Sequence, residues 1–349
     1  MTDAQPPSEE KPLTDIAVII VTYRSASLTI ESLRSLAAER STPGLRIRAV
    51  VVDNASGDVP AVSQAIQTHN WSSWVTLLLA PRNGGFAYGN NLGLRHAYLV
   101  AKPDYVYLLN PDTKVRPGAV GTLVTFLDSH GNAGIAGSGI EGPDGTDWPI
   151  AFRFPTLLSE LNDGLQFGLA SSLLRRWIVP KVMSKKPEEI DWVCGASMMV
   201  RATVIDAIGG LDENYFLYFE ETDFCYRAKR SGFATWYVPD SRVMHVRGQS
   251  TNLPELGSSP QRLPGYWFES RRRYFTVTGG VRYAVMVDIV ALIAHSLGSI
   301  KRAILGRRGS GVRHFLRDLI RHSSLWPRNR QLPPSVAFFR GADPGTGVQ

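Results

Sequence analysis

Short apolar runs alternate with polar, turn-forming residues along the first 140 positions of the chain. Four runs rich in Val, Ile and Leu are typical of buried strands: residues 16–22, 46–52, 75–79 and 105–109. Between the first two, apolar residues recur on one helical face, with Ser27 as the expected N-cap. Strand, helix and strand at this spacing predict a βαβ unit and therefore a parallel start to the sheet.

The same reasoning extends into the second half of the chain. Further strands are predicted over residues 135–140, 191–200 and 235–238, the last ending at Pro239-Asp240. Helices are predicted over residues 118–128, 202–208 and 224–231, the last beginning at Thr222 or Asp223. Residues 141–190 show no clear periodicity, and we expect no site there. The predicted class is α/β, with a mainly parallel central sheet flanked by helices.

Polar residues follow three of the predicted strands directly: Thr22-Tyr23, Asp53-Asn54 and Asn110-Pro111-Asp112. The carboxyl ends of parallel strands share one edge of a sheet, and ligands bind at that edge. A carboxylate such as Asp53 can accept hydrogen bonds from a ribose. Asp112 can hold a divalent cation that in turn binds a diphosphate. Taken alone, residues 110–112 favour a simple turn cap, and only the rest of the chain favours the metal site.

Two stretches of small residues would let a ligand approach the backbone. Residues 82–91 contain Asn83, Gly85 and Phe86, and glycines there allow positive φ. The stretch is not a Walker loop, and no G-x-G-x-x-G follows the first strand, which disfavours a dinucleotide-binding domain. Trp192 precedes Gly195-Ala196-Ser197, where either a substrate or a neighbouring element can lie against the backbone.

Three carboxylates, Glu220, Glu221 and Asp223, follow the aromatic run at 215–219. Helix capping accounts for one or two acidic residues at such a place. The apolar surroundings favour a raised carboxyl pKa, which suits a general base. His245 follows on a later strand and can complete a metal site with Asp112, although a structural histidine is the alternative.

Taken together, these motifs resemble glycosyltransferase family 2, inverting enzymes of the GT-A fold, and in particular its rhamnosyltransferase-like branch. Single motifs are weak, but the ordered set across residues 16–250 is specific. The motifs are Val21-Thr22-Tyr23, Val52-Asp53-Asn54-Ala55-Ser56, Asn83-x-Gly85-Phe86-Ala87-x-Gly89-Asn90-Asn91-x-Gly93, Leu109-Asn110-Pro111-Asp112, Gly195-Ala196-Ser197, Tyr218-Phe219-Glu220-Glu221-Thr222-Asp223 and His245-x-x-Gly248-x-Ser250.

The resemblance implies a nucleotide-sugar donor and a divalent cation, Mg²⁺ or Mn²⁺, held by Asp112 and His245. Asn110 stands where the family's Asp-x-Asp has its first carboxylate. Glu221 is the implied base, where the family usually has Asp, and this departure leaves Glu220 and Asp223 as alternatives. The donor-side residues are then Thr22, Tyr23, Asp53, Asn83, Gly85, Phe86, Asn110 and Asp112.

The branch also implies that L-rhamnose is moved from dTDP-rhamnose to a cell-envelope glycan or a polyprenyl-diphosphate-linked acceptor. The expected acceptor-side residues are Trp192, Gly195, Ala196, Arg271 and Arg272. A UDP-sugar donor is the nearest alternative. A second alternative is a non-catalytic, nucleotide-sugar-binding membrane scaffold.

Charge is unevenly distributed along the 349 residues, whose net charge is +7. Residues 271–330 hold 13 Lys or Arg and 2 Asp or Glu, whereas residues 1–270 hold 24 and 28. No nucleic-acid motif accompanies this surplus, so an anionic membrane surface is the expected partner. Residues 284–300 form either an interfacial amphipathic helix or a helix packed on the catalytic domain. Its apolar face is Met286, Ile289, Val290, Ile293, Leu297 and Ile300, and the basic residues after it are Lys301, Arg302, Arg307, Arg308, Arg313 and Arg317.

The expected organisation is a disordered tail over residues 1–12, a catalytic domain over 13–260, a basic helical extension over 261–330 and a second tail over 331–349. Two cysteines make no disulfide framework, which fits a reducing compartment. Residues 1–12 contain no apolar leader. We therefore expect a cytoplasmic protein, peripheral on the inner face of the plasma membrane.

Overall fold

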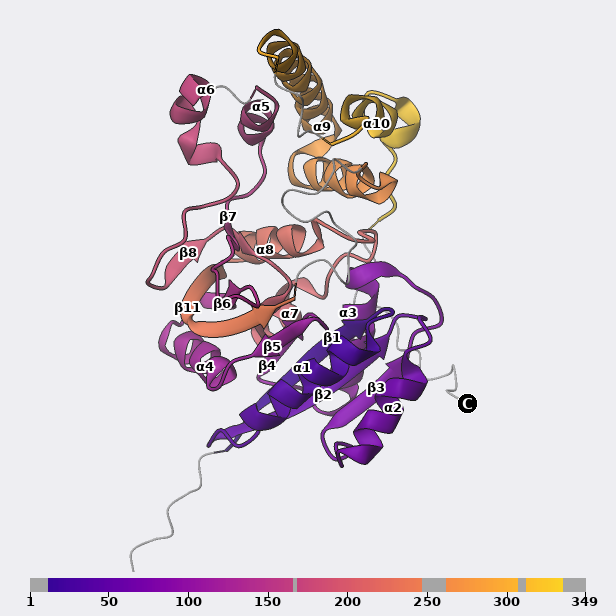
Figure 1. The fold of residues 1–349 in the computed structure, drawn as a ribbon, viewed down its shortest axis with the longest axis vertical. Helices are drawn as coiled ribbons and strands as arrows, with labels where there is room; N and C mark the ends of the chain where they lie inside the picture. The colour runs from indigo at the N-terminus through magenta and orange to yellow at the C-terminus, as the bar shows by residue number, and fades with distance from the viewer. Residues whose placement is uncertain (1–11, 166–167, 247–261, 307–311, 335–349) are drawn as a thin grey trace, which may run out of the picture.

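A nine-stranded mixed sheet, shown in Figure 1, forms the centre of the computed structural model, which describes residues 12–165, 168–246, 262–306 and 312–334. Its first half is parallel, in the order β3-β2-β1-β4. These strands are β1 (Thr14–Thr22), β2 (Leu45–Asp53), β3 (Val75–Leu79) and β4 (Tyr105–Leu109). The helices between them are α1 (Ala26–Glu39), α2 (Val59–Thr68) and α3 (Gly85–Val100). The predicted βαβ start is confirmed.

The second half of the sheet changes direction at β10 (Ser197–Arg201), which is antiparallel to both of its neighbours, β4 and β6 (Ala133–Glu141). β11 (Ala234–His245) then runs parallel to β6. β5 (Thr113–Val115) and β8 (Glu188–Ile190) both pair antiparallel with β11. This arrangement places Asp112, just before β5, beside the end of β11, although 133 residues separate Asp112 from His245.

Helices cover the sheet and complete the α/β class. α4 (Ala119–Ser129) and α7 (Ala202–Ile208) form where the sequence predicts them. The poorly patterned stretch contains β7 (Ala151–Phe152), α5 (Leu157–Leu165), α6 (Gly168–Leu173) and a 3₁₀ turn, η1 (Arg175–Trp177). The core follows the apolar runs, since every residue of β4 is buried, as are residues 16–20 of β1. Continuous burial of this kind is expected when helices cover both faces of parallel strands.

Three predicted element boundaries are wrong, each because of a tertiary contact. The strand predicted over 191–200 is divided into β9 (Trp192–Val193), which pairs with β7, and β10. β11 continues past Pro239-Asp240 through a shift in register instead of ending there. α8 (Glu220–Arg230) begins at Glu220, ahead of the predicted start.

The N-cap of α1 also differs, because Ser25 rather than Ser27 precedes the helix. The Ser25 N–H is bound by Asp58, a residue from the loop after β2.

The C-terminal helices lie at one end of the molecule. α9 (Gly265–Ile304) bends at Gly280, whose φ is 82°, and is followed by α10 (Phe315–His322) and a 3₁₀ turn, η2 (Pro327–Asn329). Figure 1 shows α5, α6, α9 and α10 together at the end opposite β2, β3 and α2. The predicted Gly248, Ser250, Arg307 and Arg308 lie outside the described residues, as does the predicted boundary at 260–261.

Candidate active site

The carboxyl ends of β1 and β2 form one polar edge, because Thr22 lies opposite Asp53 in the parallel register. The Thr22 hydroxyl donates to Asp58 over 2.8 Å, and the Ser25 N–H donates to the same oxygen over 2.8 Å. The Asp53 carboxylate accepts the N–H of Ser56 at 2.9 Å and the N–H of Gly57 at 3.3 Å. Asp58 thus links the ends of β1 and β2. Its position in the sequence did not predict this role.

The side chain of Tyr23 is exposed at this edge, with the Arg24 guanidinium 5.3 Å from its ring centroid. Arg24 has a φ of 55°, an unusual value for a residue other than glycine. An aromatic face with a neighbouring cation is suited to stacking on a base.

The glycine stretch is held by side-chain amides from both neighbouring segments. Asn54 Nδ2 donates to the Asn83 side-chain oxygen at 3.0 Å and to the Gly85 carbonyl at 3.1 Å. Gly85 has a φ of 87°, and a Cβ there would lie 1.9 Å from the carbonyl oxygen of Phe216. The Phe86 N–H donates to that same carbonyl over 2.9 Å. Glycine at 85 therefore permits close contact between the start of α3 and the aromatic loop at 215–219.

Asp112 and His245 meet across the sheet edge, with 2.9 Å between Asp112 Oδ1 and His245 Nε2. Asp112 is buried, and its carbonyl accepts the N–H of Val246 at 2.9 Å. Trp148 packs edge-on against the imidazole, with 5.3 Å between ring centroids. The indole ring of Trp148 thus supports the His245 imidazole from one side.

Asp112 and His245 are the two side chains at this edge that could hold the implied metal. Within the described ranges, no group of three or more His, Cys, Asp or Glu side chains is arranged to hold a metal ion by itself. One carboxylate oxygen and one imidazole nitrogen suit a divalent cation that takes its other ligands from phosphate and water. The pair therefore fits a cation that is held jointly with a diphosphate substrate.

Glu220 and Glu221 begin α8 side by side, with Glu220 buried and Glu221 half-buried. One oxygen of each is buried with no hydrogen-bond partner among the described residues. Burial raises the pKa of both carboxyls, and the charge of Glu221 raises the pKa of Glu220 further. A backbone interaction with Gly195 partly offsets the rise in the pKa of Glu221. A carboxylate that is desolvated and keeps an unused oxygen is suited to accept a proton.

Asp223 has a different environment from the two glutamates. Its Oδ2 pairs with Arg227 Nε at 2.8 Å, and the same guanidinium also donates to the carbonyls of Ile208 and Gly210. Burial raises the pKa of Asp223, and the Arg227 charge opposes that rise. Arg227 therefore anchors α8 to the end of α7, and Asp223 holds its guanidinium, which makes Asp223 the weakest of the three candidates for a base.

The backbone just before α8 is strained. Tyr218 and Phe219 have φ values of 71° and 69°, a left-handed conformation that is unfavourable for side chains of this size. Aromatic residues of α9 hold them: Tyr218 stacks on Tyr266 at 6.1 Å between centroids, and Phe219 packs edge-on to Trp267 at 6.0 Å. The first half of α9 thus stabilises the conformation that starts α8 at Glu220.

Gly195 and Ala196 lie where the predicted donor and acceptor sides meet. A Cβ at Gly195 would lie 3.1 Å from the Phe86 ring and 4.0 Å from Glu221 Oε1. The Ala196 carbonyl accepts the N–H of Asn110 at 3.1 Å. The fold therefore brings the glycine stretch, the end of β4 and the carboxylates of α8 around one short segment.

Trp192 is held nearby, with its ring stacked on Phe152 at 4.2 Å between centroids. Its indole N–H donates to the Arg153 carbonyl at 2.9 Å. These contacts fix the orientation of the ring. The indole N–H already has a partner within the protein.

The two arginines predicted on the acceptor side differ in environment. Arg271 is only 1% exposed and binds two carboxylates, Asp288 at 2.6 Å and Glu160 at 2.7 Å. This packing corrects the expectation of an acceptor contact at Arg271, because its charge joins the two halves of α9 to α5. Arg272 Nη1 donates to the His322 carbonyl at 2.8 Å, while its Nε is buried without a partner among the described residues.

A polar edge at the strand ends, a carboxylate–histidine pair and desolvated glutamates on a mixed α/β sheet are the features of a nucleotide-sugar-dependent glycosyltransferase with a GT-A-like fold. A sequence profile of the Glycosyltransferase like family 2 matches residues 12–256, and the chain belongs to this family.

Similar proteins agree with this class. The chain is 28% identical over 253 residues to the N-acetylglucosaminyl-diphospho-decaprenol L-rhamnosyltransferase of Mycobacterium tuberculosis, covering 68% of this chain and 78% of that protein. It is 22% identical over 240 residues to the dTDP-rhamnosyl transferase RfbF of Shigella flexneri, covering 68% and 71%. The mannosyltransferase PcManGT from Pyrobaculum calidifontis, solved with GDP-Man and Mn²⁺, has a TM-score of 0.51 at 17% identity, covering 88% and 79%. The last comparison concerns the fold alone.

Proposed function

We propose that the chain transfers L-rhamnose from dTDP-rhamnose to an acceptor linked to polyprenyl diphosphate, with inversion at the anomeric carbon. The donor and the lipid-linked acceptor are supported by the names of the Mycobacterium tuberculosis and Shigella flexneri relatives. A cell-envelope glycan is the alternative acceptor, and a UDP-sugar is the alternative donor. A soluble nucleotide sugar and a lipid-linked acceptor would meet at the cytoplasmic face of the membrane.

The position of Glu221 carries the proposal. Its carboxyl lies beside Gly195, across from the Phe86 ring, and keeps one buried oxygen without a partner in the described chain. An acceptor hydroxyl bound against Gly195-Ala196 would be within reach of this carboxyl, whose Oε1 is the oxygen nearer to Gly195. Glu221 then serves as the general base. The pKa of Glu220 beside it is raised by burial and by the charge of Glu221, so that Glu220 stays protonated while Glu221 is ionised.

The donor side would bind the nucleotide through the edge at β1, β2 and α3. Tyr23 offers a stacking face for the base, and Asp53 lies at the strand end next to it. The Asn83, Gly85 and Phe86 segment brings the start of α3 toward the sugar. Asp112 and His245 would hold Mg²⁺ or Mn²⁺, whose charge offsets that of the leaving diphosphate.

The transfer is then a single displacement. The acceptor oxygen forms a bond to the anomeric carbon while the bond from that carbon to the diphosphate oxygen breaks. The acceptor proton moves to Glu221, and the nucleoside diphosphate leaves with the bonding electron pair. No covalent sugar–protein intermediate is needed, because one base and one leaving group complete the exchange.

A donor screen tests the proposal. The purified chain is incubated with an N-acetylglucosaminyl-diphospho-polyprenol and with dTDP-rhamnose, UDP-sugars or GDP-sugars, and nucleoside diphosphate release is measured with Mg²⁺, Mn²⁺ or EDTA. We expect release from dTDP-rhamnose that EDTA abolishes, and a product whose anomeric configuration, read by NMR, is opposite to that of the donor. Release from another sugar nucleotide alone would discard the rhamnose assignment. Donor binding by calorimetry without turnover on any acceptor would favour the non-catalytic scaffold.

A further inference from the structure

The second half of α9 has two faces of different character. The inner face is made of buried, mostly small residues: Ala284, Val287, Ala291, Ala294 and Gly298. Ala294 and Gly298 pack closely against Gly164 of α5. The opposite face is a stripe of large aliphatic residues, spaced three or four apart, that are exposed: Met286, Ile289, Ile293, Leu297, Ile300 and Ile304. Ile293 is 56% exposed and Ile304 is 79% exposed. Aliphatic residues repeated at helical spacing on an outer surface indicate a face that another apolar phase covers.

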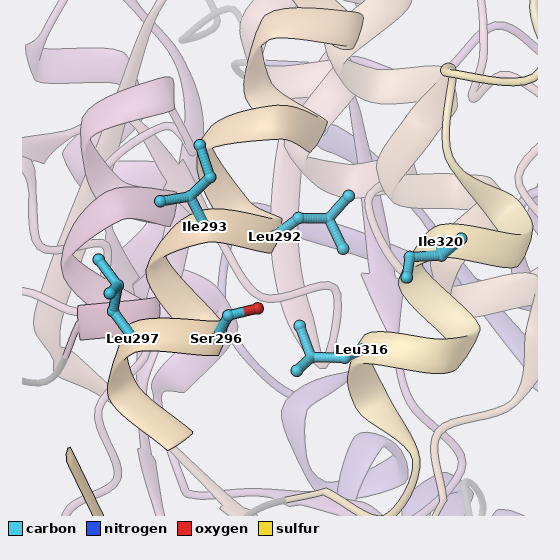
Figure 2. Close-up of a pocket in the computed structure, with 6 residues that line it drawn as sticks. All are labelled: Leu292, Ile293, Ser296, Leu297, Leu316 and Ile320. Atoms are coloured by element: carbon cyan, nitrogen blue, oxygen red, sulfur yellow. The ribbon is translucent and has the colours of Figure 1, made fainter. Parts of the chain in front are cut away.

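An open groove of about 380 Å³ extends this stripe toward α10. The groove is lined by Leu292, Ile293, Ser296 and Leu297 of α9 and by Leu316 and Ile320 of α10. In Figure 2, Leu292 and Ser296 point toward Leu316 and Ile320, whereas Ile293 and Leu297 lie on the side of α9 that faces away from α10. Ser296 is the one polar side chain in this lining. Because Ile320 is itself 44% exposed, the stripe and the groove form one apolar surface across two helices.

Positive charges border this surface. Arg313, Arg317 and Arg321 precede or lie on α10, are exposed, and make no ion pair within the described ranges. Lys301 and Arg302 lie in the last turn of α9, between Ile300 and Ile304 of the stripe. The acidic residue of α10, Asp318, is already paired with Arg262 at 2.6 Å. The border of the apolar surface is therefore cationic, which complements an anionic layer.

We propose that the apolar stripe of α9 and the α9–α10 groove dock into the outer acyl region of an anionic lipid leaflet, with the bordering arginines at the phosphates. Aliphatic residues inserted below a ring of Lys and Arg are the arrangement of an interfacial helix. A second copy of the chain is disfavoured as the occupant, because two-fold pairing of this face would bring both cationic borders together.

The helix lies in the interface and does not span the bilayer. α9 is, among the described residues, the one helix long and apolar enough to cross a membrane by length and composition, with a mean hydropathy of 1.7 over its best window. Its inner face, however, carries Asp288, which is buried in an ion pair with Arg271 and accepts the Ser324 N–H at 2.7 Å. A spanning helix would have to break these contacts and expose Asp288 to lipid.

Docking by this face would bring the candidate active site close to the leaflet. Ring contacts run from Phe219, next to Glu220, to Trp267 at 6.0 Å and on to Phe315 at 6.1 Å. Phe315 precedes Leu316 of the groove. This part of the inference rests on the proposed function, since it explains how the hydroxyl of a lipid-linked acceptor at the membrane surface reaches Glu221. The docking itself does not depend on which donor is used.

Vesicle binding by the full chain tests the docking surface. Cosedimentation is measured with phosphatidylcholine vesicles and with vesicles containing phosphatidylglycerol, for the wild type and for the double variant Ile293→Asp/Leu297→Asp. We expect binding to the anionic vesicles only, and at least roughly tenfold weaker binding by the double variant. The matched control is Leu99→Asp/Val100→Asp at the end of α3, which places the same charges on exposed apolar residues elsewhere.

Equal loss of binding in the control, or unchanged binding by the double variant, would overturn the proposal. So would a dimer in sedimentation velocity, without vesicles, that the double variant dissociates, because a second copy would then cover the stripe. Melting temperature checks that the variants fold. Turnover on a short-chain, water-soluble acceptor without vesicles should be unchanged in the double variant, which separates failed docking from a failed enzyme assignment.

Discussion

The polar groups at the ends of β1 and β2 differ from those at the start of α8 in how they are satisfied. At the strand ends, Thr22 and Asp53 find partners within the neighbouring loops. At α8, oxygens of Glu220, Glu221 and Asp223 and the Tyr218 hydroxyl are buried without partners in the described chain. Tyr218 and its neighbour Phe219 also have a strained backbone. Both regions lie in the same sheet-and-helix framework.

This difference separates binding from chemistry. Satisfied loops lower the free energy of the folded chain and present a rigid edge for a nucleotide. Unsatisfied buried carboxyls raise that free energy, and they persist only because the rest of the fold holds them. The unfavourable region is therefore the one we assign to the chemical step.

The strongest test of the contrast is Glu221→Gln, which keeps the shape of the side chain and removes the base. Turnover should fall by about 10²- to 10⁴-fold while donor affinity is unchanged. Steady-state rates and calorimetry with the donor measure the two quantities. Glu189→Gln, on the exposed β8 residue, is the control and should leave both unchanged. Full turnover by Glu221→Gln would move the base to Glu220.

The next effect concerns stability. Arg271→Met leaves Asp288 and Glu160 buried without their counter-charge, and the free energy of unfolding should fall by about 3–5 kcal/mol. Urea denaturation measures it, with Arg282→Met on the exposed side of α9 as the control. A change confined to the acceptor KM, with stability intact, would restore Arg271 to the acceptor side.

A pair of glycine variants tests the contact between the donor loop and the aromatic loop. Gly118→Ala places a Cβ in open space at a φ of 81° and should cost about 1–2 kcal/mol from backbone strain alone. Gly85→Ala adds a collision with the Phe216 carbonyl, so it should cost more and also slow turnover. Thermal melts and rates compare the two. Equal stability losses would mean that the loops are free to separate.

The smallest expected effect is a pH-dependent gain in stability in the variant Glu220→Gln. Burial raises the folded-state pKa of Glu220 above its unfolded value. Stability from such a carboxyl is fully present below the unfolded pKa and is lost as pH rises through the folded pKa. Glu220→Gln cannot ionise, so its melting temperature should match the wild type near pH 4 and exceed it by a few degrees at pH 8. The control is Glu189→Gln, at an exposed residue, whose melting temperature should not diverge from that of the wild type as pH rises. If the difference in melting temperature between Glu220→Gln and the wild type stayed constant across this range, the assigned burial would be contradicted.

Much of the fold could be predicted because buried strands are recognisable from local composition. β3 and β4 have their predicted bounds, β1 and β2 differ by one or two residues, and α7 spans residues 202–208 as expected. The errors at α8 and β11 arise where distant contacts override local preference. The left-handed Tyr218 and Phe219 are supported by Tyr266 and Trp267, some fifty residues away.

Local sequence was enough to predict which residues follow the strands and which family their order resembles, because strand ends and glycine positions are local properties. Which of these residues come into contact depends on the tertiary structure. Inserting β10 between β4 and β6 brings Gly195 to Phe86 and Glu221, and the β5–β11 pairing brings Asp112 to His245. Tertiary packing also determines that Arg271 is buried while the aliphatic stripe of α9 is exposed. Periodicity defines the faces of a helix, but only packing determines which of them the protein covers.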